Sequence, residues 1–333
     1  MRRPRRPVTW AWACSAVVAV FAAVLFAAPL MGVERWHVIA AALPARAALG
    51  AAFAVALVVA LVGLCRRTWR PQAGVPVAVA LALATALHLP VVLARGVVGE
   101  PVAAPAAGQL RLLEWNTNTD LTTPDVVAEL AAAQDADVVV LPEVAPASGS
   151  TYRQAFAAAG DPLVRVDRHT STTQVAVWMA PQLARHYATL PGPDPVKTVE
   201  LRPDTASLPT VLALHAPWPV GARLAGWDRD VDWVAAQCSA GTPVLVAGDF
   251  NASTDDFGGA RLGRCLDAAT QQQDAGVGTW STHLPTLLAM PIDHVLATPS
   301  VGTVTSFSVL TSEDGSGTRH RPTMTVVAVA DRP

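Results

Sequence analysis

The sequence predicts an α/β domain that follows a helical membrane anchor. Its first 107 residues contain three uncharged apolar stretches of about 20 residues, the length of a membrane-spanning helix. Later in the chain, short apolar runs alternate with stretches of helical periodicity, and several of these runs end in an acid, an amide or a histidine. The chain is 52% hydrophobic and only 15% charged, against roughly 25% charged residues in soluble domains.

The charges divide the chain into two parts. Residues 1–107 hold 10 of the 24 basic residues and two of the 26 acidic ones, a net charge of +8. Residues 108–333 hold the other 14 basic and 24 acidic residues, a net charge of −10. We therefore predict a membrane anchor over residues 1–98, a linker rich in Pro, Ala and Gly over 99–109, and a separate domain over 110–333.

The predicted membrane spans are residues 10–30, 47–65 and 75–94. Each is uncharged and long enough to cross about 30 Å of hydrocarbon as a helix. A cleaved signal peptide is the alternative for the first span, but two further spans follow and no clean cleavage site is visible. The apolar stretch 36–44 is expected at the membrane interface, with Trp36 as an anchor.

Arginines in the short loops predict the orientation of the anchor. Four precede the first span and three lie between the second and third, whereas two lie between the first and second. They are Arg2, Arg3, Arg5 and Arg6; Arg66, Arg67 and Arg70; and Arg35 and Arg46. Because basic loops stay in the cytoplasm, the N-terminus is predicted to be cytoplasmic and residues 110–333 extracytoplasmic. We thus expect a multi-pass protein of the cell membrane.

Cys238 and Cys265 are the only cysteines in the predicted outer domain. A pair of cysteines in an oxidising compartment is a candidate disulfide. Because the sequence does not supply the geometry that a bridge needs, two separate buried thiols remain the alternative.

The most informative stretch of the domain is 244–251, which reads Val-Leu-Val-Ala-Gly-Asp-Phe-Asn. Four apolar residues followed by glycine predict a buried strand that ends in a turn. Asp249 and Asn251 lie two residues apart, so they point to the same face of an extended chain. A carboxylate can deprotonate a water molecule, and an amide N–H can donate to a phosphoryl oxygen. The purely structural alternative is an Asx-type turn.

Five other predicted strands carry a polar residue of a catalytic type at or beside one end. These residues are Asn116, Glu143, His215, Asp293 and His320. A single acid or histidine in such a place is usually structural, but six strand ends of this kind predict one shared site at one edge. The donors are oxygen atoms and imidazoles with no thiolate pattern, which favours a hard cation such as Mg²⁺ or Mn²⁺.

Together these motifs resemble the endonuclease/exonuclease/phosphatase superfamily, which includes DNase I-like nucleases, inositol polyphosphate phosphatases and neutral sphingomyelinases. The resemblance covers about residues 110–330 and implies a four-layer α/β sandwich with two facing sheets. Gly-Asp-Phe-Asn and the downstream Ile-Asp-His are its most specific parts. The matching positions, in the family's order, are 115–116, 141–144, His215 with Pro217, 248–251, 279–280, 292–294 and 320–322.

The resemblance implies a metal site and a water-activating group. Glu143 would ligate the metal, with Asn116 in support. Asp249 would orient the attacking water. These roles suit metal-assisted hydrolysis of a phosphoester, in which the site neutralises charge, positions the groups and supplies a nucleophile.

The resemblance also implies groups that hold the phosphate. Asn251 and His215 would bind phosphoryl oxygens. His320 would stabilise or protonate the transferring group, and Asp293 would orient its imidazole.

One motif departs from the family's pattern. Where the family usually has Ser-Asp-His before the final proline, this chain has Thr-Arg-His at 318–320. Either the metal has fewer protein ligands or Arg319 contacts a phosphate directly, and Glu313 or Asp314 could partly replace the missing acid.

Three spans followed by an outward domain with these motifs resemble the VanJ-type membrane proteins linked to teicoplanin resistance. A net charge of −10 and a single lysine, Lys197, argue against nucleic acid as a partner of the domain. We expect a phosphoesterase that acts on a lipid-linked phosphate or pyrophosphate, such as a polyprenyl carrier, in cell-envelope metabolism or glycopeptide resistance. Trp218 and Trp280 are expected to flank its cleft.

The expected partners are the lipid bilayer and this substrate, and nothing in the sequence indicates a protein partner. One alternative is a tethered extracellular nuclease or a sphingomyelinase-like phosphodiesterase. Another is a non-catalytic envelope protein that binds lipid headgroups or glycopeptides.

Overall fold

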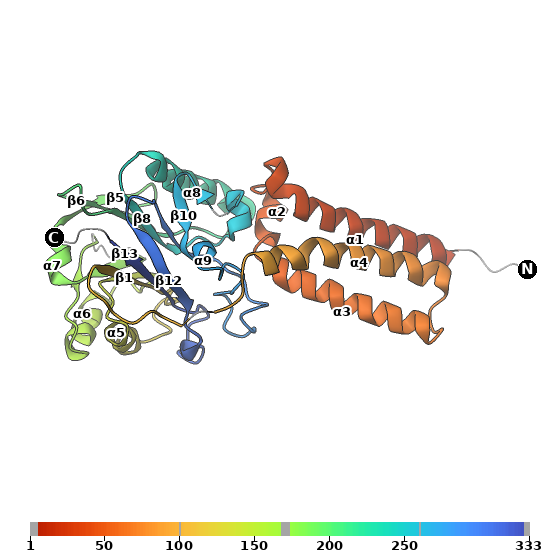
Figure 1. Cartoon of the computed structure of the whole chain (residues 1–333), viewed down its shortest axis with the longest axis horizontal. Helices are drawn as coiled ribbons and strands as arrows, with labels where there is room; N and C mark the ends of the chain where they lie inside the picture. The colour runs from red at the N-terminus through yellow and green to blue at the C-terminus, as the bar shows by residue number, and fades with distance from the viewer. Residues whose placement is uncertain (1–5, 100, 168–173, 260, 330–333) are drawn as a thin grey trace, which may run out of the picture.

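The computed structural model describes residues 6–99, 101–167, 174–259 and 261–329, so Arg2, Arg3 and Arg5 of the orientation argument lie outside the described residues. A bundle of long helices and an α/β domain lie end to end (Figure 1).

Three helices of the bundle are long and apolar enough to cross a membrane. They are α1 (Arg6–Met31), α3 (Arg46–Cys65) and α4 (Pro71–Ala94). α4 lies between the other two, and the short helix α2 (His37–Ala42) caps the end of the bundle that faces the domain (Figure 1). Many outward side chains of the bundle are apolar and exposed, such as Val58, Val59 and Leu83, as expected for a surface in contact with lipid.

The α/β domain contains two mixed sheets. The first has the order β12-β13-β1-β2-β4-β3 and the second the order β5-β6-β7-β8-β11-β10-β9. The strands of the first are β1 (Gln109–Glu114), β2 (Val138–Pro142), β3 (Val164–Arg165), β4 (Val175–Met179), β12 (Thr303–Val309) and β13 (Thr323–Ala328). Those of the second are β5 (Tyr187–Pro191), β6 (Thr198–Pro203), β7 (Thr210–His215), β8 (Val244–Asp249), β9 (Arg261–Leu262), β10 (Cys265–Asp267) and β11 (Asp293–Ala297).

Helices cover the outer faces of both sheets, which confirms the predicted four-layer sandwich. In β2, Val138 and Val140 face the other sheet, whereas Val139 and Leu141 pack under the outer helices α5 and α6. This alternation is the two-residue period of a strand buried on both faces. The helices are α5 (Pro124–Ala133), α6 (Gly149–Ala158), α7 (Pro181–Ala184), α8 (Leu224–Ser239) and α9 (Ala268–Gln271), with short turns η1 (Gly221–Arg223), η2 (Thr254–Phe257) and η3 (Thr311–Glu313).

The helix α8 covers the second sheet with one apolar face. Trp227, Val231, Val234 and Cys238 recur at helical spacing and are fully buried. Cys238 is bonded to Cys265 of β10, with Cα atoms 5.4 Å apart. The helix is thereby joined covalently to the sheet that it covers.

A buried ion pair fixes the α/β domain to the anchor. Asp255 of η2 has one carboxylate oxygen 2.5 Å from Nε of Arg46, the first residue of α3. The same oxygen contacts Arg95, which follows α4. Arg46 also donates to the carbonyl of Leu25 in α1, at 3.1 Å. A single carboxylate of the domain therefore connects to all three long helices.

We predict that Asp255→Ala detaches the domain from the anchor. The change leaves the buried Arg46 and the partly buried Arg95 without a counter-charge, and breaking a buried pair costs about 3–5 kcal/mol in comparable cases. Thermal unfolding of the detergent-solubilised protein and protease cleavage of the segment 95–109 would report the loss. Asp232→Ala is the control, since Asp232 makes an exposed ion pair with Arg35 worth about 0–1 kcal/mol. Equal effects of the two changes would contradict the prediction.

Candidate functional site

The carboxyl ends of four central strands meet at one edge of the two sheets. β1 and β2 run parallel in the first sheet, and β7 and β8 run parallel in the second. The antiparallel strands β13 and β11 begin at the same edge. This topology brings together six predicted site residues, namely Asn116, Glu143, His215, Asp249, Asp293 and His320.

Close packing of β7 against β8 depends on Gly248. Its φ is +150°, and a Cβ at this position would lie 2.0 Å from the carbonyl oxygen of Leu214. No other residue type fits there without moving a strand. The pairing aligns His215 with Asp249, so an imidazole and a carboxylate stand side by side at the strand ends.

Asp249, Asp293 and His320 form a buried acid–base group. Asp249 and Asp293 are opposite each other in the pairing of β8 with β11. Nδ1 of His320 lies 3.1 and 3.0 Å from the two carboxylate oxygens of Asp293. Nε2 of His320 lies 4.0 Å from Asp249 Oδ2, so the imidazole stands between two acids.

This arrangement raises the pKa values of two groups, His320 and Asp249. Burial alone would lower the pKa of His320, but the charge and hydrogen bond of Asp293, with the charges of Asp249 and Glu143, raise it to about 9. Burial and the charge of Asp293 raise the pKa of Asp249 to about 6, although both neighbouring histidines oppose the shift. Asp249 can therefore act as a base near neutral pH, where His320 is still protonated.

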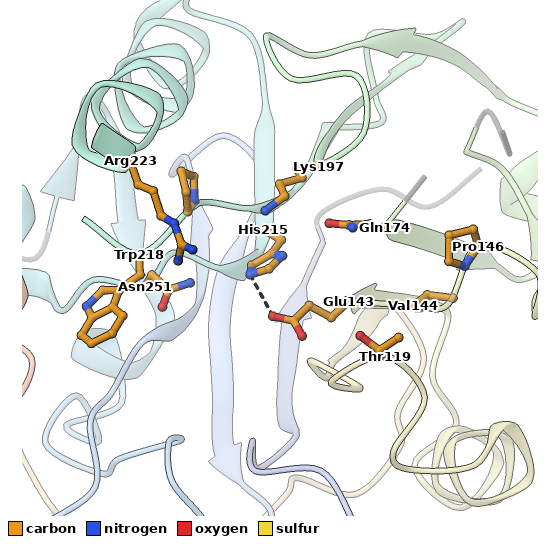
Figure 2. A pocket seen from close by; sticks show the side chains of 11 residues that line it. Thr119, Glu143, Val144, Pro146, Gln174, Lys197, His215, Trp218, Arg223 and Asn251 are labelled. Atoms are coloured by element: carbon orange, nitrogen blue, oxygen red, sulfur yellow. Dashed lines mark ion pairs between the residues drawn. The ribbon is translucent and has the colours of Figure 1, made fainter. Parts of the chain in front are cut away.

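Glu143 and His215 face each other across the gap between the sheets (Figure 2). Nε2 of His215 lies 3.1 Å from Glu143 Oε1 and 3.8 Å from Asp249 Oδ2. The hydrogen bond from His215 lowers the pKa of Glu143 to about 2, despite partial burial. Asn116 donates from Nδ2 to Asp249 Oδ2 at 2.9 Å. Glu143 is therefore anionic at any physiological pH, as a metal ligand must be.

Asn251 sits at the turn after β8 in a left-handed conformation, with φ of +50°, and Glu143 has φ of +54°. Non-glycine residues in this region are uncommon and concentrate at functional sites. The side chain of Asn251 donates to the carbonyl of Ala216 at 2.9 Å, and its backbone N–H donates to Asp249 at 2.8 Å. These bonds fix Asn251 against the loop that follows His215.

The sequence analysis did not identify Glu114, which lies beneath the site. It is fully buried in β1 and accepts a hydrogen bond from the hydroxyl of Thr323 at 3.2 Å. Burial and the charges of Asp293 and Asp249 raise its pKa well above the usual value. The raised pKa of Glu114 favours its protonated form beside these carboxylates. The feature of the sequence that could have identified Glu114 is its position as an acidic residue within a largely apolar predicted strand.

Arg319 and the two acids near it in the sequence, Glu313 and Asp314, have different surroundings in the structure. Arg319 is exposed and lines a cavity next to His320. Asp314 accepts hydrogen bonds of 2.7 Å from two nitrogens of Arg321, and Glu313 accepts one from the adjacent serine at 2.9 Å. Neither acid lines a cavity at the site, so the expectation that one of them replaces the missing acid was wrong. Both carboxylate oxygens of Asp314 are already paired with Arg321.

Two cavities meet at the catalytic edge, and Glu143, Trp218 and Asn251 line both. The first, which we call the polar cavity, has a volume of about 530 Å³ and is drawn in Figure 2. Its other polar side chains include His215, Lys197 and Arg223.

The second cavity lies against the anchor and has a volume of about 340 Å³; we call it the anchor-side cavity. Two residues of the anchor, Ala41 and Pro44, form part of its wall. The rest of the lining combines apolar and polar side chains, namely Asn118, Trp280, Met290, Ile292, Arg319, His320 and Asp249. Both tryptophans expected beside the cleft therefore line a cavity.

The site contains two groups of side chains with potential metal-ligand atoms within 4.8 Å of one another. One group is Glu143, His215 and Asp249, and the other is Asp249, Asp293 and His320. The first fits a divalent cation better, because Glu143 is ionised and open to the polar cavity, whereas Asp293 is occupied by His320. Carboxylate oxygens with the Asn116 amide beside them are a donor set for a hard cation.

The chain was compared with known proteins. Residues 113–320 match the model of the Endonuclease/Exonuclease/phosphatase family. No curated protein matches the chain.

Several solved structures are similar in fold. An endonuclease/exonuclease/phosphatase from Beutenbergia cavernae DSM 12333 is 20% identical, with a TM-score of 0.50, over 66% of this chain and 72% of that one. An AP endonuclease from Archaeoglobus fulgidus is 13% identical, with a TM-score of 0.51, over 66% of this chain and 100% of that one. Because the family model matches more than half of the chain, this protein belongs to the Endonuclease/Exonuclease/phosphatase family.

Proposed function

We propose that this protein is a membrane-anchored, metal-dependent phosphoesterase whose active site faces outward and hydrolyses a lipid-linked phosphate or pyrophosphate. The family and the group of ionised and protonated side chains at the strand ends support phosphoester hydrolysis. The arginines between the second and third helices, Arg66, Arg67 and Arg70, support a cytoplasmic loop there and an extracytoplasmic domain.

In the proposed reaction, Asp249 accepts a proton from a water molecule whose oxygen bonds to the phosphorus. The bond from phosphorus to the departing oxygen breaks, and that oxygen keeps the electron pair and takes a proton from His320. Asp293 holds the imidazole in the required orientation, at 3.0 Å. His215 and Asn251 would contact the phosphoryl oxygens.

A divalent cation such as Mg²⁺ or Mn²⁺ would neutralise the phosphoryl charge when bound. Glu143 would hold it, with Asn116 in support. Arg319 forms no ion pair with an acid within 4.0 Å among the described residues. Its guanidinium is therefore available to contact a phosphate oxygen.

The proposal of a lipid-linked substrate rests on the residues that form the wall of the anchor-side cavity. Asp249 and His320 line the same cavity as Ala41 and Pro44, which belong to the membrane anchor. Trp280, together with Met290 and Ile292, makes the remaining wall largely apolar. A phosphate bound at the catalytic edge would therefore have a hydrocarbon-compatible surface leading to the bilayer.

The charge of the domain supports the same choice. A nuclease that binds DNA without sequence preference needs a basic surface, whereas residues 108–333 have a net charge of −10. The resemblance to VanJ-type proteins supports a role in cell-envelope metabolism or glycopeptide resistance.

The first prediction concerns activity. The full-length protein in detergent is expected to release phosphate from a polyprenyl pyrophosphate with Mg²⁺ or Mn²⁺, and not with EDTA. Asp249→Asn and His320→Ala should each lower kcat by about 10²–10⁴-fold, because each removes one proton transfer. Asp125→Asn, on the exposed face of α5, is the control. Cleavage of DNA without release from the lipid would identify a nuclease instead, and inactivity on both would support a binding protein.

The second prediction concerns pH. If protonated His320 is required, kcat/KM should fall as pH rises through about 9, the pKa of this group. Asp293→Asn removes the main charge that stabilises the imidazolium, so the fall should move to lower pH by about 1–3 units. Asp267→Asn is the matched control, because Asp267 lies 2.8 Å from Nδ1 of His294 in another buried acid–histidine pair. An unchanged pH profile in Asp293→Asn would contradict the role of His320.

A further inference from the structure

The polar cavity contains two cations that the proposed reaction does not use. Lys197 is the only lysine in the chain and is half-buried, and Arg223 is the last residue of η1. Both side chains extend from opposite walls toward the space beside His215 (Figure 2). In a domain with an excess of ten acidic residues, two cations in one cavity need an explanation.

Neither cation is neutralised by an ion pair within 4.0 Å in the part of the chain that the structure describes. Two acids in the same region, Asp194 and Asp230, are paired with another arginine. Arg229 lies 3.8 Å from Asp194 and 2.9 Å from Asp230. The charges of Lys197 and Arg223 therefore remain available to something that enters the cavity.

The backbone positions that carry both cations are constrained relative to the strand ends of the site. The carbonyl of Lys197 accepts the backbone N–H of His215 at 2.9 Å, which ties Lys197 to the end of β7. Arg223 follows the loop that begins with Pro217-Trp218-Pro219, in which the prolines limit the backbone. Trp218 of this loop lines both cavities, so the cations lie on one side of the catalytic edge and the anchor on the other.

We propose that Lys197 and Arg223 form a subsite for a second phosphate, so that the substrate is a pyrophosphate of a long-chain alcohol. This inference rests on the proposed function and narrows its substrate. The chain would lie in the anchor-side cavity, the reacting phosphate at Glu143 and Asp249, and the terminal phosphate in the polar cavity. A cationic headgroup such as choline would be repelled from this subsite.

The reaction balances with one water molecule. The water oxygen bonds to the phosphorus held at Glu143 and Asp249, and Asp249 takes the proton. The bond from that phosphorus to the bridging oxygen breaks, and this oxygen keeps the electron pair, takes a proton from His320 and leaves as part of the phosphate held by Lys197 and Arg223. The products are the lipid monophosphate and inorganic phosphate.

The test compares Lys197→Met and Arg223→Gln with Arg261→Gln, which removes an exposed cation that lines neither cavity. The probes are farnesyl pyrophosphate and bis(p-nitrophenyl) phosphate, a diester without a second phosphate. Each subsite variant should raise KM for farnesyl pyrophosphate by about tenfold or more, as expected for a lost charge-assisted hydrogen bond. The loss should be much smaller on the diester, and Arg261→Gln should change neither.

A binding measurement separates failure of this inference from failure of the proposed function. Methylenediphosphonate, which resists hydrolysis, should bind the wild-type protein and bind each subsite variant about tenfold more weakly by calorimetry. Equal binding by all proteins, or equal losses on both substrates, would overturn the subsite while leaving the phosphoesterase intact. Inactivity of the wild type on both substrates would overturn the proposed function, and the calorimetry would still decide whether the subsite exists. Arg223 is exposed, so its variant tests the subsite even if Lys197→Met misfolds.

Discussion

The antiparallel register of β8 and β11 sets Asp249 directly opposite Asp293, and the chemistry of the site depends on this one constraint. Two buried carboxylates in adjacent positions repel each other, so at least one must gain a proton or a cationic partner. His320 supplies the partner to Asp293, and Asp249 retains a raised pKa. Burial and the charges of these two carboxylates also raise the pKa of Glu114, which lies beneath them. A strand register thus yields a base and an acid suited to neutral pH.

A second constraint connects the site to the helical bundle. Asp255 lies four residues after Asn251 and forms ion pairs with Arg46 and Arg95 at the end of the helical bundle. The turn that carries Asn251 is therefore held against the end of the helical bundle at a fixed distance. A domain on a flexible tether would present its site at many distances from the bilayer, whereas this one keeps its anchor-side cavity at the end of the helices.

The sequence predicted those features that depend on local pattern. Apolar runs predicted the strands. Because parallel strands end at the same edge of a sheet, polar residues that follow them, such as Glu143 and Asp249, could be assigned to one site. Glu114 was missed because its proximity to Asp249 and Asp293 arises only when the two sheets pack together. Asp314 was misjudged because its partner, Arg321, becomes a neighbour only through a turn that the sequence does not determine. Ala41 was missed because its contact with the site crosses from the anchor to the domain.

Residues at strand ends and residues in loops also differ in what they can do. Strand ends, which hold Asp249 and His215, can fix reacting groups to within a hydrogen bond, because the sheet is rigid. Loops and the anchor, which supply Lys197, Arg223 and Pro44, line the two cavities around that edge. Changes in loops leave the sheet intact, so binding preference can vary while the catalytic groups stay in place. Under the proposed function, the choice of substrate would therefore depend on the parts of the chain whose position is set by tertiary contacts.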